Sequence, residues 1–344
     1  MPQAATLLAE PAAGSDFAPL LRQVRDQGLL GRRRGWYALS ITVNLMALAA
    51  TAAGIVLSGD SWWTVLLAVP AALFWARTAF VGHDSGHAQI AATRRTGRLI
   101  GLLHADLLLG MSYAWWNDKH NRHHANPNHV DKDPDVGVGA LVWTQRQAAQ
   151  RQGRAVRWLT RNQARLFFPM LLLEGINLKI SSVRDLGRQS AGERRTEAVL
   201  LALHLAGYAG LLLSSMSPGK AVVFALVHHA LFGLHLGMVF APNHKGMEMP
   251  DPGGERWGHL QRQVLTSRNV RGGAVTDWLM GGLNYQIEHH LFPNMPRPHL
   301  RLARPLVRAH CRASGLPYTE TGIVDSYRQA LQHMHEVGAP LRTG

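Results

Sequence analysis

The sequence predicts an all-α integral membrane protein with four transmembrane helices in two hairpins, and a cytosolic helical cap that holds a two-metal site. Three observations predict this fold: long apolar runs without charge, strongly basic connections between some of them, and histidines gathered in short motifs. The mean hydropathy of −0.07 conceals the pattern, because the apolar runs are averaged with stretches dense in arginine.

The apolar runs set the number of predicted spans. A helix that crosses a bilayer needs about 20 mostly apolar residues. Four segments meet this requirement: 36–57, 62–81, 198–216 and 221–242. Two shorter runs, 99–111 and 166–173, are predicted to be interfacial or re-entrant helices.

The connections between these runs predict their orientation. The loop 58–61 has no basic residue and the loop 217–220 has one, whereas the other connections are rich in arginine. By the positive-inside rule, both termini and the large connections face the cytoplasm. The predicted N-terminal arm is 1–35 and the predicted C-terminal tail is 311–344. Between them, the membrane domain spans 36–310 and includes the cytosolic cap in two parts, 82–197 and 243–310. In a bacterial cell this membrane would be the inner membrane.

Charge and cysteine usage narrow the class of protein. The formal charge of +14 suggests nucleic acid or an anionic membrane surface as a neighbour. The sequence contains no nucleic-acid-binding motif, and the apolar runs favour membrane lipids. Cys311, the single cysteine, excludes an internal disulfide and a thiolate metal site. Segment 1–17 carries acids and no basic n-region, which predicts a flexible lead-in and not a signal peptide.

Three motifs concentrate the histidines. They are HDSGH at 83–87, HNRHH at 120–124 and QIEHH at 286–290. Residues three and four apart share one face of a helix, so each motif can direct its side chains at one metal ion. Neutral imidazole suits iron, zinc and copper alike, although zinc sites rarely gather so many ligands. The spacing therefore predicts a metal centre and leaves its metal open.

These motifs, the third continuing as QIEHHLFP, resemble the three histidine boxes of the membrane fatty acid desaturases. The resemblance extends over about residues 81–293. It implies a centre of two ferrous ions, with O2 as co-substrate, that dehydrogenates an acyl chain carried by a lipid or by CoA. The box histidines that it implies as iron ligands are His83, His87, His120, His123, His124, His289 and His290.

Other positions follow or depart from the family pattern. His244 stands where the family often has a further ligand after the fourth span, and we expect it to be the eighth ligand. Gln286 replaces a common histidine, as in front-end desaturases, which insert a double bond between an existing one and the carboxyl group. We expect Gln286 to act through water or to orient substrate, with Asn243 as a further candidate because Phe240 replaces an asparagine of some members.

The electron source is also implied by the resemblance. Many front-end enzymes carry a fused cytochrome b5 with an HPGG haem motif, which this sequence lacks. The expected partner is therefore an external electron donor, such as a ferredoxin or a cytochrome b5 with its reductase.

Acidic residues near the boxes are candidates to orient the ligands. A ligating imidazole usually donates its second N–H to an oxygen. Asp84 and Glu288, inside two boxes, are the first candidates, followed by Asp118 and the acids at 131, 133 and 135. The histidines within the fourth predicted span, His228, His229 and His235, are expected to pack between helices instead of binding metal.

Two other functions remain open from the sequence. The first is a di-iron hydroxylase of a fatty acyl, alkane or carotenoid substrate, although the box spacings favour desaturation. The second is a non-enzymatic membrane metal-binding or transport protein. That function predicts ligands at the bilayer midplane, whereas the boxes lie beyond the ends of the predicted spans.

Overall fold

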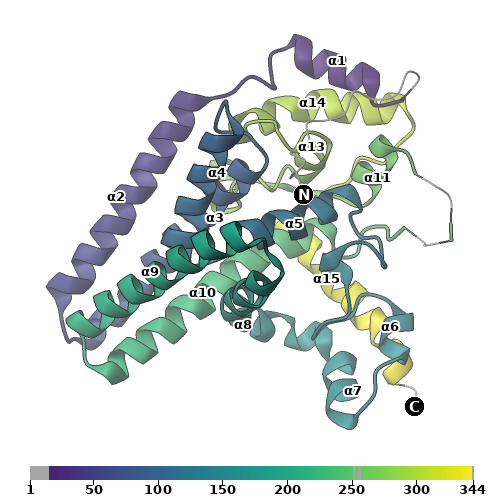
Figure 1. The fold of residues 1–344 in the computed structure, drawn as a ribbon. Helices are drawn as coiled ribbons and strands as arrows, with labels where there is room; N and C mark the ends of the chain where they lie inside the picture. Colours follow the sequence, from purple (N-terminus) through teal and green to yellow (C-terminus); the bar gives the residue numbers. More distant parts are fainter. Residues whose placement is uncertain (1–14, 251–252, 255–256, 343–344) are drawn as a thin grey trace. The chain divides into compact units, whose positions relative to one another are not determined.

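The computed structural model describes residues 15–250, 253–254 and 257–342, and it is mostly helical (Figure 1). The chain divides into two compact units. The span unit comprises Arg32–Asp118 and Met170–Met238. The cap unit comprises Met1–Gly31, Lys119–Pro169 and Val239–Gly344. Helices α5, α8 and α10 contribute residues to both units.

Long helices dominate the span unit. Its elements, some shared with the cap unit, are α2 (Arg34–Ser58), a 3-10 turn (Trp62–Leu67), α3 (Ala68–Gly86), α4 (Arg94–Leu102), a π-helix (Leu103–Leu109), α5 (Tyr113–Ala125), α8 (Gln163–Asp185), a 3-10 turn (Leu186–Arg188), α9 (Ala191–Ser215) and α10 (Pro218–His244). The run predicted at 99–111 thus forms two short consecutive helices.

Five helical segments of the described chain are long and apolar enough to cross a membrane. They are Arg34–Ser58, Trp62–Gly86, Gln163–Arg188, Ala191–Ser215 and Pro218–His244. Four of them contain or overlap the predicted spans. The fifth corrects the prediction of a short interfacial helix at 166–173, so two hairpins alone do not account for the apolar helices.

The extension of α8 has a physical explanation. The apolar run in the sequence is interrupted by Pro169, Glu174 and Lys179. The predicted segment was therefore shorter than the helix in the structure. In the structure the Lys179 ammonium is satisfied inside the span unit, because it donates to the carbonyl of Leu109 at 2.5 Å and lies 3.2 Å from His204 Nε2. Pairing with backbone carbonyls is how an ionisable residue is accommodated within an apolar helix.

The helices of the span unit pack through apolar and small residues. Ile55 of α2, Leu212 of α9 and Phe224 of α10 share one buried cluster. Between α8 and α10, a Cβ atom on Gly233 would collide with the backbone nitrogen of Gly175. Small residues that allow such close backbone approach are typical of helix interfaces in membranes.

The cap unit is built from shorter elements. Besides parts of α5, α8 and α10, it contains α1 (Ala18–Asp26), a 3-10 turn (Pro134–Val136), α6 (Gln145–Ala149), α7 (Arg154–Arg161), α11 (His259–Leu265), α12 (Ala274–Leu279), α13 (Gln286–Leu291), α14 (Arg297–Ala313), α15 (Ile323–Val337) and a 3-10 turn (Ala339–Leu341). Two strands, β1 (Asn269–Arg271) and β2 (Glu320–Gly322), pair in parallel with Asn269 opposite Glu320. This small ladder corrects the all-α prediction, because strands of three residues leave no alternating pattern to read.

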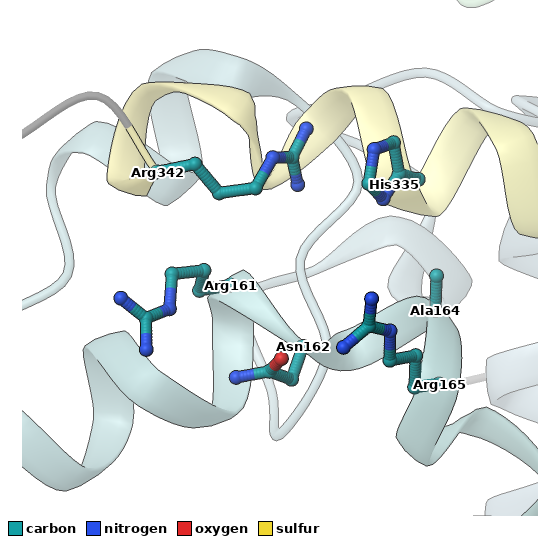
Figure 2. Close-up of a pocket in the computed structure, with 6 residues that line it drawn as sticks. All are labelled: Arg161, Asn162, Ala164, Arg165, His335 and Arg342. Atoms are coloured by element: carbon teal, nitrogen blue, oxygen red, sulfur yellow. The ribbon is translucent and has the colours of Figure 1, made fainter.

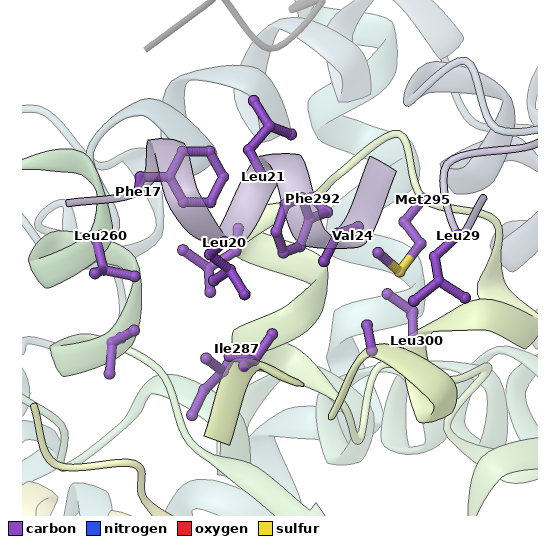
Figure 3. Packing of buried hydrophobic residues seen from close by; sticks show 14 of the residues in the cluster. Phe17, Leu20, Leu21, Val24, Leu29, Leu260, Ile287, Phe292, Met295 and Leu300 are labelled. Atoms are coloured by element: carbon purple, nitrogen blue, oxygen red, sulfur yellow. The ribbon is translucent and has the colours of Figure 1, made fainter. Parts of the chain in front are cut away.

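A hydrophobic core in the cap unit joins α1 to α13 and α14 (Figure 3). Leu20 and Val24 of α1 are fully buried in the same cluster as Ile287 and Phe292. Their positions on α1 follow the spacing of an amphipathic helix. Packing against α1 therefore helps to hold α13, which carries the third histidine motif.

The N-terminal segment differs in part from the predicted lead-in. Residues 1–14 lie outside the described residues, so the structure does not bear on them. Phe17, the last residue of the predicted flexible segment, is buried at 2% exposure and contacts the ring of Phe292 at a centroid distance of 5.2 Å. The prediction was wrong for Phe17, which belongs to the core.

Candidate metal centre

The first histidine motif lies in the span unit at the end of α3. His83 is in the last turn of α3, and His87 follows it directly. Both side chains are buried, and their ring centroids are 4.8 Å apart. Asp84 lies between them in sequence, and its Oδ1 is 2.9 Å from Nδ1 of His83. The hydroxyl of Tyr37 donates to the other oxygen of Asp84 at 3.0 Å, which orients that carboxylate.

The other two motifs lie in the cap unit, on α5 and α13. His123 and His290 converge there with His244, which ends α10. The Nε2 atoms of His123 and His244 are 3.3 Å apart, and the rings of His244 and His290 have centroids 4.6 Å apart. All three side chains are at least 95% buried. Together they offer three nitrogen atoms within 4.8 Å of one another.

The remaining histidines of the two motifs form a second group. The Nε2 atom of His124 lies 3.1 Å from Nε2 of His120 and 3.1 Å from Nε2 of His289. The His124 ring also stacks on that of His290, with centroids 4.2 Å apart and planes inclined by 18°. The two groups are therefore neighbours within the cap unit.

Hydrogen bonds on the Nδ1 side fix how these imidazoles face the site. His244 Nδ1 lies 2.9 Å from the carbonyl oxygen of Thr266, which can only accept, so this nitrogen carries the proton. The Nε2 atom of neutral His244 then presents a lone pair. His290 Nδ1 lies 2.9 Å from Oε1 of Gln263, whose amide nitrogen donates to the carbonyl of His124. Lone pairs that converge in a buried site fit a bound transition-metal cation.

His123 is held by a carboxylate in the loop after α5. Its Nδ1 atom lies 2.9 Å from Oδ2 of Asp133. The backbone N–H of Asn128 donates to the same oxygen at 2.8 Å, and that of Asp135 donates to the other at 2.8 Å. Asn128 has a φ of 58°, a left-handed conformation that asparagine tolerates better than most residues. Its amide donates to the carbonyl of His244 at 3.0 Å, so this one side chain ties the loop to α10.

Lysines surround the acids of this loop. Lys119 pairs with the carboxylate of Asp135, and Lys245 donates to the Asp135 carbonyl at 3.0 Å. Burial alone would raise the pKa of Asp135, but the positive charges of Lys119, His123 and Lys245 and the hydrogen bond from Lys119 together outweigh that effect and hold the pKa well below its ordinary value. Burial lowers the pKa of Lys245, whose ammonium also lies 3.9 Å from the ring centroid of Trp143.

Gln286 and Asn243 form a chain of amides that ends at His244. The Asn243 amide nitrogen donates to the carbonyls of Val239 and Leu283, which fixes its orientation. Oε1 of Gln286 also lies 3.2 Å from this nitrogen and shares one of its two hydrogens, and the Gln286 nitrogen lies 2.8 Å from His244 Nε2. In this arrangement the Gln286 NH2 group faces the lone pair of His244 Nε2, which a bound metal would take in its place.

Glu288, a predicted partner of the ligands, points elsewhere. Its carboxylate accepts from the amide of Asn269 at 2.7 Å and from the hydroxyl of Tyr318 at 2.7 Å. Burial raises the pKa of Glu288 to about 7, although both hydrogen bonds act in the opposite direction. Glu288 therefore braces α13 against β1 and does not orient a histidine within the described residues.

The histidines within α10 make contacts of a different kind. In the span unit, His228 Nδ1 lies 2.8 Å from the hydroxyl of Tyr208 and its ring lies 4.0 Å from that of Trp75. His229 Nδ1 lies 2.8 Å from the carbonyl of Ala225, one turn earlier on the same helix. These contacts are those of packing residues, and His228 is fully buried.

Comparison with known proteins identifies the family of this chain. The profile of the Fatty acid desaturase family matches residues 60–322, which is most of the chain. The chain belongs to the fatty acid desaturase family.

Curated relatives carry more particular names. The chain is similar to an acyl-lipid (9-3)-desaturase of Physcomitrium patens, with 28% identity over 95% of this chain and 63% of the relative. It is 30% identical to Delta(8)-fatty-acid desaturase 2 of Arabidopsis thaliana over 88% of this chain and 70% of the relative. It is 32% identical to the Delta(5) fatty acid desaturase fat-4 of Caenorhabditis elegans over 74% of this chain and 58% of the relative. The chain thus spans roughly two thirds of the length of these relatives.

Proposed function

We propose that this protein is an O2-dependent di-iron fatty acyl desaturase that introduces a double bond into an acyl chain linked to a lipid or to CoA. The observation that carries the proposal is the convergence of His123, His244 and His290 in a buried site of a member of this family. The proposed ligands are His83, His87, His120, His123, His124, His244, His289 and His290. His83 and His87 are proposed as ligands because their motif, HDSGH, resembles the first histidine box of the family.

The residues around the centre have distinct tasks in this proposal. When bound, two ferrous ions supply the O2 chemistry that removes hydrogens from two neighbouring methylenes. Asp133 and the carbonyl of Thr266 hold the Nδ1 protons of two imidazoles, so that both Nε2 atoms face the metals. Gln263 does the same for His290. Asp84 is proposed to act on His83 in this way, given the 2.9 Å separation of their atoms.

The third motif and the relatives favour a front-end reaction on a lipid-linked chain. Gln286 stands where front-end desaturases depart from the common histidine. The relatives bear the names Delta(8)- and Delta(5)-desaturase and acyl-lipid desaturase. In this proposal Gln286 acts through water or orients the substrate. Its NH2 group lies 2.8 Å from His244 Nε2 and competes with iron for that lone pair, so it cannot position a metal-bound His244.

The proposal also names partners and a location. The substrate is an acyl-lipid or an acyl-CoA in contact with membrane lipids. The electrons come from an external donor, a ferredoxin or a cytochrome b5 with its reductase. The arginine-rich connections support an active site on the cytoplasmic side of the membrane.

Lipid analysis of a host that expresses the protein tests the proposal. We expect an acyl chain that has lost two hydrogens, with the double bond located by chemical derivatisation. His123→Ala should abolish this product, whereas His129→Ala, outside both histidine groups, should retain it. A product that has gained one oxygen would indicate a hydroxylase. An iron-loaded protein that modifies no acyl chain would contradict the proposal and favour a metal-binding role.

A further inference from the structure

A basic pocket in the cap unit lies outside the histidine site. Its volume is about 350 Å³, within the range of small-molecule sites, which run from about 300 to 1,000 Å³. It is lined by Arg161, Asn162, Ala164, Arg165, His335 and Arg342. Figure 2 shows Arg342 and His335 on one side of the pocket, facing Arg161, Asn162 and Arg165 on the other.

The break between α7 and α8 brings two of the arginines to this pocket. Asn162 follows directly after α7, and its side-chain amide donates to the carbonyl of Trp158 at 2.8 Å. Its own carbonyl accepts from the backbone N–H of Arg165 at 2.9 Å. The chain therefore ends one helix and begins the next within a few residues. Arg161 and Arg165 consequently line the same pocket from two different helices.

The charges of the pocket are not balanced within the described residues. Its lining contains three arginines and a histidine but no carboxylate. None of the three guanidinium groups forms an ion pair with an acid in the described part of the chain, and the Nη1 atom of Arg342 is buried there without a hydrogen-bond partner. Like charges around one cavity repel one another, and an anion between them would remove that repulsion. The planar guanidinium fork matches the oxygens of a phosphate group.

The position of the pocket in the sequence points to the membrane surface. Arg165 lies in the first turn of α8, where the candidate span Gln163–Arg188 begins. The adjoining helix α7 exposes Trp158 at 53% and Val156 at 42%, beside Arg154 and Arg157. Exposed tryptophan and arginine on a short helix next to a span are typical of the headgroup region of a bilayer.

We propose that this pocket binds a phosphate group, presented by the headgroup of an anionic lipid. The site is independent of the proposed desaturation, because it contains none of the histidines of the metal centre. A lipid held there would fix the start of α8 at the membrane surface through Arg165. The same phosphate chemistry could be satisfied by free phosphate, so the experiment includes both sources.

The test uses the full chain purified in a neutral detergent. Thermal unfolding is followed while adding short-chain phosphatidylglycerol, short-chain phosphatidylcholine or inorganic phosphate, since a ligand that binds the folded state raises Tm. We expect phosphatidylglycerol to raise Tm at lower concentrations than the other two. The double variant Arg161→Gln, Arg165→Gln should weaken its apparent affinity by about tenfold or more, as expected for the loss of charge-assisted hydrogen bonds.

A charge-matched control separates the pocket from general attraction. Arg308→Gln with Arg312→Gln removes two exposed arginines from α14 and should leave the response unchanged. Inorganic phosphate could raise the Tm of the wild type as much as phosphatidylglycerol does, yet leave the Tm of the pocket variant unchanged. This result would support the phosphate site and contradict the lipid headgroup as its source. Equal responses of the two double variants would overturn the proposal. Phosphorus retained per purified chain gives a second readout, which should fall only in the pocket variant.

Discussion

Replacement of Asp133 by asparagine tests whether a carboxylate sets the direction of His123. The side chain keeps its shape, but its two oxygens become one oxygen and one NH2 group. In the wild type, Oδ2 faces the Nδ1 atom of His123 and the N–H of Asn128, while Oδ1 accepts from the N–H of Asp135. An amide cannot satisfy all three donors.

Both orientations of the new amide have a cost. If the NH2 group faces Asp135, two donors meet in a buried site, which costs about 1–3 kcal/mol. If it faces His123, Nδ1 must become an acceptor, and the proton moves to Nε2, where it blocks the lone pair that would bind metal. Another acceptor, Oδ2 of Asp135, lies 3.5 Å from Nδ1, beyond a good hydrogen bond.

The expected loss of metal affinity is about 10- to 100-fold, the range found for residues that orient metal ligands. This corresponds to about 1.4–2.8 kcal/mol. The assay is iron per chain after anaerobic equilibration with a competing chelator. Asp131→Asn is the matched control, because Asp131 lies in the same loop but is exposed. If the Asp133 variant folds normally and holds iron as tightly as the control, the reasoning is refuted.

Three further changes test other parts of the structure. Burial and the negative charge of Glu197 raise the pKa of Asp106 from 3.8 to about 8. The stability that protonated Asp106 contributes is present below its unfolded pKa and is lost as pH rises through 8, at about 1.4 kcal/mol per pKa unit. Asp106→Asn should therefore flatten the dependence of Tm on pH in this window, and an unchanged curve would argue against the shift. Gly233→Ala should destabilise the protein by about 1–3 kcal/mol through overpacking. Gly207→Ala is the control, because a Cβ atom at Gly207 meets open space and should not destabilise the protein. Equal Tm values of the two variants would contradict the close approach of α8 and α10. Gln286→Ala should not weaken iron binding, because it removes an NH2 group that competes for the His244 lone pair while the Thr266 carbonyl still holds the ring, and a loss as large as that of Asp133→Asn would make Gln286 a ligand.

The histidine motifs could be found from the sequence because helical spacing is a local property. His120, His123 and His124 stand on α5 as the spacing required, and His289 and His290 stand on α13. The contact between these two helices within the cap unit is a property of the tertiary fold, which local spacing does not encode. It was expected because all three motifs are predicted on the cytoplasmic side of the membrane, and because they resemble those of a known family.

Most of the groups that orient the imidazoles could not be predicted from the sequence. Thr266 acts through its backbone carbonyl, which every residue has, and Gln263 is one amide on a short helix with no surrounding pattern. Asn128 gave a weak signal, since asparagine after Pro127 favours a turn with positive φ. Asp133 was one of several acids in its loop, and only the fold shows that its oxygen meets His123.

Glu288 shows why a residue inside a motif need not serve that motif. Helix α13 has six residues, too few to be stable by its own hydrogen bonds. Ile287 is buried in the core with α1, and its backbone N–H donates to Oδ1 of Asn269 at 2.9 Å, while the Asn269 amide donates to Glu288. The side chains of one turn thus divide between two tasks. His289 and His290 face the other imidazoles, whereas Ile287 and Glu288 attach the turn to the core and to β1. The direction of the ligands is therefore set by burial of their neighbours, so a cavity made at Ile287 should disturb metal binding without removing any ligand.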